Sequence, residues 1–199
     1  MNFSSDVAHN PLRMNLFTAH GRTFVVDYAH NAASYRAILD TARTLGGREL
    51  VLAASAPGDR TDESIREIGR VCGELADRAF FYPMRDRRGR GPDDIPRLMH
   101  EGAAQVRSAD RLATCNGVHD AVRQALAGTS PGDLIVIGCT DSLDDLTGAV
   151  SEAVEIAASA PGPCELQRFT APEMPQTIAA DASRSPASAP AAVSLEPQT

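Results

Sequence analysis

The segment Thr23-Phe24-Val25-Val26-Asp27-Tyr28-Ala29-His30-Asn31 decides the fold class, because a short β-branched strand leads directly into a polar junction and then into a helix. The strand at 23–27 is apolar on both faces, which is typical of a sheet covered on two sides. Asn31 is a favourable N-cap for the helix that follows. We therefore predict an α/β domain with polar residues where its strands end.

The same alternation of strand and helix continues along the chain. Further strands are expected at 16–18, 49–53, 78–82, 111–114 and 133–137, the first of them antiparallel and joined to 23–27 by a His20-Gly21 turn. Apolar residues recur at helical spacing in 35–45, 65–75, 118–126 and 143–154, and another helix is expected to begin near Asp93 or Asp94. This order predicts a Rossmann-like, three-layer, mostly parallel sheet of about 5–6 strands with helices on both faces.

Composition changes near Ala160. Residues 161–199 hold seven of the thirteen prolines, many alanines and serines, and little aliphatic periodicity. Such a segment buries too little apolar surface to offset the entropy lost on ordering. We predict one folded domain over 1–158 and a disordered Pro/Ala/Ser-rich tail over 159–199.

Charge and composition exclude several classes of function. The 199 residues carry 26 acidic side chains against 19 basic ones, a formal charge of −7, which disfavours a nucleic-acid binder. All the basic residues are arginine, so the chain has no phosphate-binding lysine of the Walker type and no Schiff-base lysine. No apolar window approaches the roughly 18 residues of a membrane span. Because the first twenty residues also lack the apolar core of a secretory signal, we expect a cytoplasmic protein with no membrane partner.

The cysteines and histidines show no metal-ligand spacing, so we predict reduced, mostly buried thiols and no metal site in this chain. His119 is interpreted as a surface or capping residue. Thr140-Asp141-Ser142 is interpreted chiefly as the cap of a last helix, with a role at a cleft as the alternative.

Three junctions carry candidate binding residues. Asp27 ends the first parallel strand and His30 follows three residues later, and capping does not explain them as it explains Asn31. Residues 55–62 form a turn by composition, which is either a surface loop with an ion pair or part of a binding site. Residues 85–91 hold four arginines and suit contact with an anion or another domain, or a solvated connection; neighbouring acids and the lack of aromatic residues disfavour RNA binding.

Four blocks of sequence resemble, in order and spacing, the C-terminal domain of Mur-type ligases, and most closely that of cyanophycin synthetases. The resemblance covers about 1–155. The blocks are Asn10-Pro11-x-Arg13-x-Asn15-Leu16-Phe17, Val26-Asp27-Tyr28-Ala29-His30-Asn31, Pro57-Gly58-Asp59-Arg60-x-Asp62-Glu63-x-Ile65-Arg66-Glu67 and Arg87-x-Gly89-Arg90-Gly91-x-x-x-Ile95-Pro96-x-Leu98.

The resemblance implies an ATP-dependent ligase that joins a carboxylate to an amine through an acyl phosphate. It implies that Asp27 hydrogen-bonds the nucleotide ribose and that His30 and Asn31 lie against the nucleotide. It also implies that Asp59, Arg60 and Arg90 face the amino-acid substrate. In such enzymes the P-loop and the Mg²⁺ ligands belong mainly to a central domain, so ATP and Mg²⁺ are the implied cofactors.

Two departures from the family pattern stand out. Ala32 replaces the proline that usually follows His-Asn, a change that a helix start tolerates. The larger departure is that no GxxxxGK[ST] element is present. We therefore expect a ligase domain that is inactive alone and works with a separately encoded Mur-type ATPase domain; the alternative is a stand-alone, noncatalytic module that binds a nucleotide, an amino acid or a partner.

Overall fold

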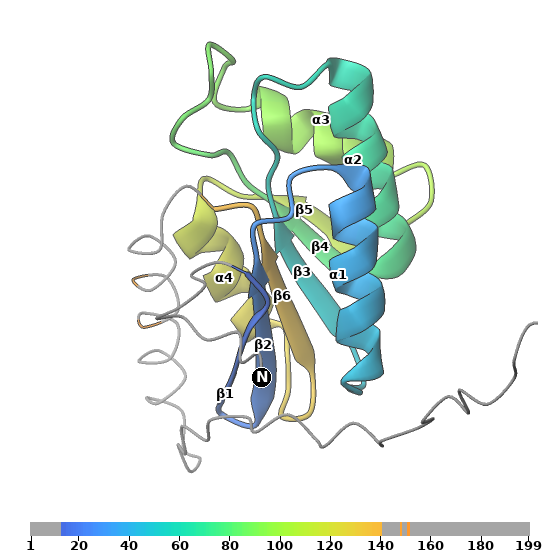
Figure 1. The fold of residues 1–199 in the computed structure, drawn as a ribbon, viewed down its shortest axis with the longest axis vertical. Helices are drawn as coiled ribbons and strands as arrows, with labels where there is room; N and C mark the ends of the chain where they lie inside the picture. The colour runs from blue at the N-terminus through green and yellow to red at the C-terminus, as the bar shows by residue number, and fades with distance from the viewer. Residues whose placement is uncertain (1–12, 141–147, 149–150, 152–199) are drawn as a thin grey trace, which may run out of the picture. The chain divides into compact units, whose positions relative to one another are not determined.

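The structure is a computed structural model that describes residues 13–140 together with Gly148 and Ser151. In this part of the chain six strands form one sheet in the order β1-β2-β6-β3-β4-β5 (Figure 1). The pair β1–β2 is antiparallel and every other neighbouring pair is parallel. The elements are β1 (Asn15–Ala19), β2 (Arg22–Asp27), α1 (Ala32–Thr44), β3 (Leu50–Ala54), α2 (Asp62–Leu75), β4 (Arg78–Phe81), α3 (Asp94–Ala103), the short 3-10 helix η1 (Ala109–Arg111), β5 (Leu112–Thr114), α4 (Val118–Ala127) and β6 (Leu134–Gly138).

The predicted fold class is confirmed. Every strand expected from the sequence is present with each end within one residue of the prediction, and α3 begins at the expected place. Of the predicted last helix, 143–154, the structure describes Gly148 and Ser151, both helical. The rest of that helix, the end of the predicted domain and the predicted tail at 159–199 lie outside the described residues, so the domain boundaries stay predictions.

Burial on both faces explains the apolar strands. In β3, Leu50, Leu52 and Ala54 face one hydrophobic cluster, whereas Val51 and Ala53 face the other. Successive side chains of a strand point to opposite faces, so a strand covered on both sides must be apolar throughout. Helices α1, α2 and α3 contribute to the first cluster and α4 to the second, which gives the three layers seen in Figure 1.

The edge hairpin forms as the sequence predicts. His20 and Gly21 connect β1 to β2, with φ angles of 51° and 70°. Two consecutive positive φ angles define the primed turn whose twist matches that of antiparallel strands. The predicted tight turn is therefore confirmed, and β1 closes one edge of the parallel sheet.

The last strand in the sequence lies in the middle of the sheet. Gly138, at the end of β6, pairs with Asp27 of β2 on one side and with Ala54 of β3 on the other. Ala54 in turn pairs with Phe81 of β4, and Phe81 with Thr114 of β5. All five parallel strands thus end at one level, so the segments that follow them gather along a single edge.

Helices α2 and α3 cross at very short range because glycines face the contact. A Cβ at Gly69 would lie 2.0 Å from the carbonyl oxygen of Met99, and a Cβ at Gly102 would lie 1.9 Å from that of Arg66. Both distances are far below van der Waals contact. The crossing fixes α3 against α2, and with it the segments that lead into the two helices.

Replacing Val136 by aspartate is expected to unfold the domain. Val136 is fully buried in the central strand β6, where an unpaired carboxylate has neither water nor a partner. Val106 is 45% exposed, so Val106→Asp is the matched control that should stay folded. Circular dichroism of both variants checks this; a folded Val136→Asp protein would contradict the sheet assignment.

Replacing Gly69 by alanine is expected to destabilise the domain by about 1–3 kcal/mol through overpacking. Helix propensity alone favours alanine by about 1 kcal/mol, so the sign of the change separates packing from propensity. At Gly73, on the same helix, an added Cβ would lie 2.9 Å from the nearest Ala103 atoms, so Gly73→Ala should cost less. Urea unfolding of the two variants measures both changes, and a stabilised Gly69→Ala would contradict the close crossing.

Candidate functional site

The carboxyl edge of the parallel strands is the place to seek a site, because ligands of open α/β sheets bind where strands end and helices begin. The level strand ends bring the junction after β2 next to the segments that follow β6 and β3. Residues 57–62 and 85–91 follow the ends of β3 and β4. The segments singled out in the sequence therefore belong to one edge.

Asp27 is half-buried at the last position of β2. Its Oδ2 accepts the backbone N–H of Met14 at 3.0 Å, and its own carbonyl accepts the N–H of Cys139 at 3.1 Å. Among the described residues no donor reaches Oδ1. The carboxylate is thus held by one oxygen while the other remains available to a hydroxyl group.

His30 lies three residues further on, with its ring tilted against that of Tyr28 at a centroid distance of 5.8 Å. Its Nδ1 is 3.2 Å from the carbonyl oxygen of Tyr28, which can only accept, so Nδ1 carries the proton. The other nitrogen, Nε2, has no partner in the described part of the chain. In the neutral ring Nε2 accepts a hydrogen bond, and in the protonated ring it donates one.

Asn31 is the N-cap of α1, as the sequence predicts. Its side-chain oxygen accepts the N–H of Ser34 at 2.8 Å, and the Ser34 hydroxyl accepts the N–H of Asn31 at 3.1 Å. This reciprocal capping box satisfies two backbone donors that the helix itself leaves free. The acceptor oxygen of Asn31 is therefore engaged within the chain, and the predicted nucleotide contact of Asn31 stays a prediction.

The loop at 57–62 begins α2 and carries the predicted substrate residues. Thr61 is the N-cap, with its Oγ1 accepting the N–H of Ser64 at 3.2 Å. Asp59 is exposed and accepts from Arg88 Nη1 at 2.7 Å. Arg60 is exposed, and its guanidinium approaches only Asp59 within the described residues, at 4.0 Å.

Arg60 and Asn31 line the same groove, which has a volume of about 550 Å³ and lies between the N-terminal ends of α1 and α2. Ser64, Glu63 and Glu67 also line it. Asp27 and His30 are not among its lining residues, so the predicted nucleotide residues and the predicted substrate residues meet in this groove through Asn31 and Arg60.

Arg90, predicted to face the substrate, uses its guanidinium within the chain. Its Nε donates to the Gly58 carbonyl at 2.8 Å, its Nη1 to Asp62 Oδ1 at 2.8 Å and its Nη2 to the Arg60 carbonyl at 2.6 Å. The side chain is 20% exposed. These contacts attach residue 90 to the loop at 57–62, and the predicted substrate contact of Arg90 stays a prediction.

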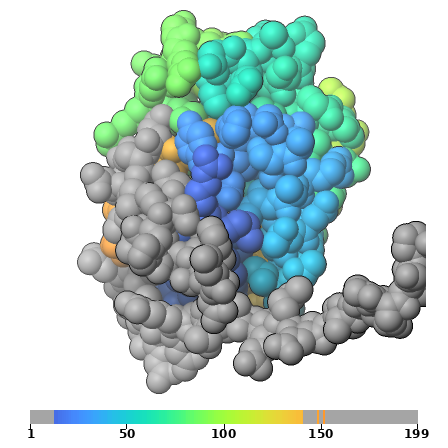
Figure 2. Space-filling model, in the orientation of Figure 1, coloured from blue at the N-terminus to red at the C-terminus, as the bar shows by residue number. Residues whose placement is uncertain are grey.

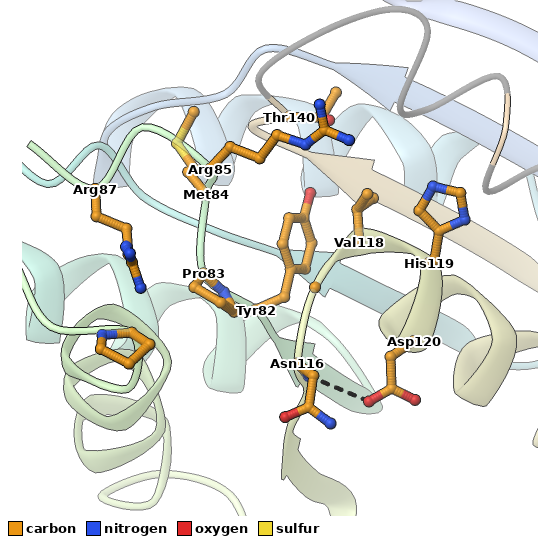
Figure 3. A pocket seen from close by; sticks show the side chains of 12 residues that line it. Tyr82, Pro83, Met84, Arg85, Arg87, Asn116, Val118, His119, Asp120 and Thr140 are labelled. Carbon is orange, nitrogen blue, oxygen red and sulfur yellow. Dashed lines mark hydrogen bonds between the residues drawn. The ribbon is translucent and has the colours of Figure 1, made fainter.

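A pocket of about 600 Å³ lies where β4, β5 and β6 end (Figure 3). Tyr82 forms its inner wall and donates to the carbonyl oxygens of Gly138 and Cys139 at 2.9 and 3.2 Å. Figure 3 shows Arg87 on the side of the pocket opposite His119 and Asp120. The remaining lining residues are Pro83, Met84, Arg85, Pro92, Asn116, Gly117, Val118 and Thr140.

The sequence does not predict this pocket, although Thr140 and residues of the arginine-rich segment 85–91 line it. Arg87 is exposed, and no described residue hydrogen-bonds or pairs with its guanidinium. The signal that would have found the pocket is the one used for Asp27, namely polar residues directly after parallel strands. Asn116 follows β5 and Thr140 follows β6 in this way.

Asp120 supplies a fixed negative charge beside this pocket. Burial opposes its ionisation, but hydrogen bonds from Gln124, Asn116 and Arg123 outweigh that cost and hold the pKa of Asp120 below its ordinary value. The carboxylate lies in the first turn of α4, where the helix dipole also favours a negative charge. It is therefore charged at neutral pH.

No cluster of three or more metal-ligating side chains occurs among residues 13–140, Gly148 and Ser151. Within the same residues no helix is long and apolar enough to cross a membrane. Cys72, Cys115 and Cys139 are buried free thiols, as predicted, while Cys164 lies outside the described residues.

Comparison with known proteins identifies the family. Residues 12–139 match the model of the Mur ligase family described as the glutamate ligase domain. This chain belongs to that family. The match spans the hairpin, all four helices of the described part and the sheet up to the end of β6.

Curated relatives of this Mur ligase domain include cyanophycin synthetases. The one from Nostoc sp. strain PCC 7120 is 30% identical over 154 residues, which cover 77% of this chain and 16% of the relative. The one from Synechocystis sp. strain PCC 6803 is 29% identical over 154 residues, covering 77% and 17%. The chain thus spans about a sixth of the length of these relatives.

Solved structures share the fold of this Mur ligase domain at lower identity. A UDP-N-acetylmuramoyl-L-alanyl-D-glutamate–2,6-diaminopimelate ligase aligns with a TM-score of 0.59 and 21% identity over 73% of this chain and 32% of its own. MurF ligase from Thermotoga maritima, solved with ADP, aligns with a TM-score of 0.52 and 11% identity over 73% and 32%.

Replacing Asn31 by alanine is expected to destabilise the domain by about 1 kcal/mol, because the N–H of Ser34 loses its acceptor at the start of α1. Asn31→Asp keeps an acceptor and should stay near the wild-type stability. Thermal unfolding of both variants measures the difference. An alanine variant as stable as the wild type would show that the cap contributes nothing and would leave ligand contact as the remaining role of Asn31.

Proposed function

We propose that this chain acts as the C-terminal domain of an ATP-dependent acid–amino acid ligase of the Mur and cyanophycin synthetase group. In this proposal the carboxyl edge of the sheet closes over a nucleotide and an incoming amino acid held by a central ATPase domain. The observation that carries the proposal is the alignment of strand ends that places Asp27 beside the segments following β6 and β3, within a domain matched by the family model.

The nucleotide role is assigned to Asp27, His30 and Asn31. A ribose offers two hydroxyl donors, and the free Oδ1 of Asp27 suits one of them. Nε2 of His30 suits either a hydroxyl or, when the ring is protonated, a phosphate oxygen. These hydrogen-bonding groups therefore fit a nucleotide, and ATP would supply the phosphoryl group that activates the carboxylate.

Binding of the amino-acid substrate is assigned to Asp59 and Arg60, together with Arg90, which hydrogen-bonds the loop that carries them. A guanidinium fork matches a carboxylate in geometry and charge, and that of Arg60 is exposed with a single partner 4.0 Å away. Asp59 offers a negative charge to an amino group. Both lie on the loop that begins α2.

Magnesium and the P-loop lysine are assigned to the central domain. The described residues hold no cluster of metal ligands, and the 199 residues hold no lysine. The proposal therefore includes a partner, a Mur-type ATPase domain supplied by another stretch of polypeptide. It also places the protein in the cytoplasm.

The missing lysine also favours a second candidate, a stand-alone module that binds a nucleotide or an amino acid without catalysis. The two candidates differ in one result. A ligase domain releases ADP and forms an amide when combined with a Mur-type ATPase domain, whereas a stand-alone module binds its ligand and forms no amide.

Calorimetric titration with ATP and ADP in the presence of Mg²⁺, alone and with aspartate or arginine, tests the proposal. We expect Asp27→Ala to weaken nucleotide binding about tenfold or more, because a ribose hydroxyl loses its charged acceptor. Asp40→Ala, an exposed acid on α1, is the matched control and should bind as the wild type does. The free energy of unfolding of Asp27→Ala should lie within about 1 kcal/mol of the wild-type value, as is usual for substitutions at polar positions away from caps.

The titration is repeated with a Mur-type ATPase domain present, and amide formation is followed by mass spectrometry. Amide formed with the partner supports the ligase. Binding without amide formation supports the stand-alone module. No binding in either condition would overturn both candidates.

A further inference from the structure

Two loops at the carboxyl edge of the sheet touch through their backbones. A Cβ on Gly58 would lie 2.1 Å from the carbonyl oxygen of Arg87, so only a glycine lets the loops approach this closely. The first loop, 57–62, joins β3 to α2, and the second, 85–91, lies between β4 and α3. Figure 1 shows the second loop in green, projecting beyond the sheet beside the start of α2, and Figure 2 shows the same green segment as a ridge on the surface.

Arg90 ties the two loops together. Its three donors reach the carbonyls of Gly58 and Arg60 and the carboxylate of Asp62, at 2.6 to 2.8 Å. A second link runs from Arg88 Nη1 to Asp59 Oδ2 at 2.7 Å. The Arg88 and Asp59 side chains are each about half exposed, so this link contributes little, whereas the Arg90 side chain is only 20% exposed.

We propose that Arg90 is a positioning residue that locks the two loops into one rigid unit, which presents the guanidinium groups of Arg60 and Arg87 to the ligand. This inference rests on the proposed function, because it assumes that the loop at 57–62 receives the amino acid. In this proposal Arg90 acts through the two loops and not through a contact of its own with the ligand. Its contribution is to remove the conformational freedom that the loops would otherwise lose on binding.

The choice of arginine follows from the acceptors. Two of them are carbonyls and the third is a carboxylate, spread over residues 58 to 62, and each is met by a different nitrogen of one planar group. An ammonium group is a single point of charge and cannot reach all three. Lysine at position 90 would therefore keep the charge and lose the lock.

The arrangement also divides the arginines of this edge by role. The guanidinium groups of Arg88 and Arg90 are engaged by the neighbouring loop, whereas that of Arg87 has no partner within the described residues and Arg87 lines the 600 Å³ pocket. Arg60 lines the groove between the N-terminal ends of α1 and α2. The Arg90 contacts thus join a loop whose Arg60 lines one hollow to a loop whose Arg87 lines another.

Amide hydrogen exchange of the full chain, measured by NMR without ligand, tests the lock. The reporter is the amide of Arg60, which donates to the Pro57 carbonyl at 3.3 Å, and the reference is the amide of Val136 in the core strand. We expect Arg90→Lys and Arg90→Ala to speed exchange at Arg60 about tenfold or more and to leave Val136 unchanged, as a local opening does. Arg97→Lys, which alters an arginine paired with Glu101 and Asp94 on α3, is the matched control and should change neither amide.

Two results would overturn the lock. Wild-type exchange at Arg60 in Arg90→Lys would show that charge suffices and that the fork is not needed. Equal acceleration at Arg60 and Val136 would show that Arg90 stabilises the whole domain rather than the loops.

A titration separates the positioning role from a structural one. If the chain binds its ligands as proposed, Arg90→Lys should weaken amino-acid binding about tenfold while leaving nucleotide binding unchanged, because the nucleotide residues lie on the β2 junction. Equal loss for both ligands would contradict the positioning role. Because exchange is measured without ligand, a chain that binds nothing would refute the proposed function and leave the lock to be judged by exchange alone.

Discussion

The carboxyl edge of this domain depends on how the end of β6 fits between β2 and β3. Gly138 has no side chain, and the ring of Tyr35 occupies the space where one would be, 2.6 Å from the position of a Cβ. The buried hydroxyl of Tyr35 donates to the Ser55 carbonyl at 2.7 Å, and that of Tyr82 donates to the Gly138 carbonyl at 2.9 Å. Burial raises the pKa of Tyr35 well above its ordinary value, so it remains a neutral donor at any physiological pH. Tyr35 and Tyr82 therefore hold the ends of β3, β4 and β6 at one level.

Everything proposed for the site follows from that level edge. Asp27 is held at the end of β2 by backbone groups of Met14 and Cys139, which come from the hairpin and from the turn after β6. The contact with Cys139 would not exist if β6 slipped by one residue, since a slip also turns every side chain of that strand to the other face. Packing on both faces of the sheet thus fixes the strand register, and the register leaves the Asp27 carboxylate at the carboxyl edge.

The fold was predictable from the sequence because each strand and helix carries its own local pattern. A run such as Leu134–Ile137 is apolar throughout only when both faces are covered, and His20-Gly21 is suited to its turn by the freedom of glycine and the short connection. The caps at Asn31 and Thr61 follow from the same local rules. Arg90 shows where such reasoning ends. Its partners are about thirty residues away, and the sequence shows an arginine in a charged loop but not the approach of a second backbone at Gly58.

The pocket beside Tyr82 was missed for a related reason. Its walls come from the segments after β4, β5 and β6, and only the strand order places the last of these near the first. From the sequence alone, Thr140 fits both a helix cap and a cleft residue, because the two roles differ in which segment lies beside it. The same argument applies to Arg87, Arg88 and Arg90, which lie on one loop and carry the same charge. Residues 87, 88 and 90 differ only in whether an acceptor lies opposite, so the tertiary contact between the loops decides which cation braces the fold and which remains free to meet an anion.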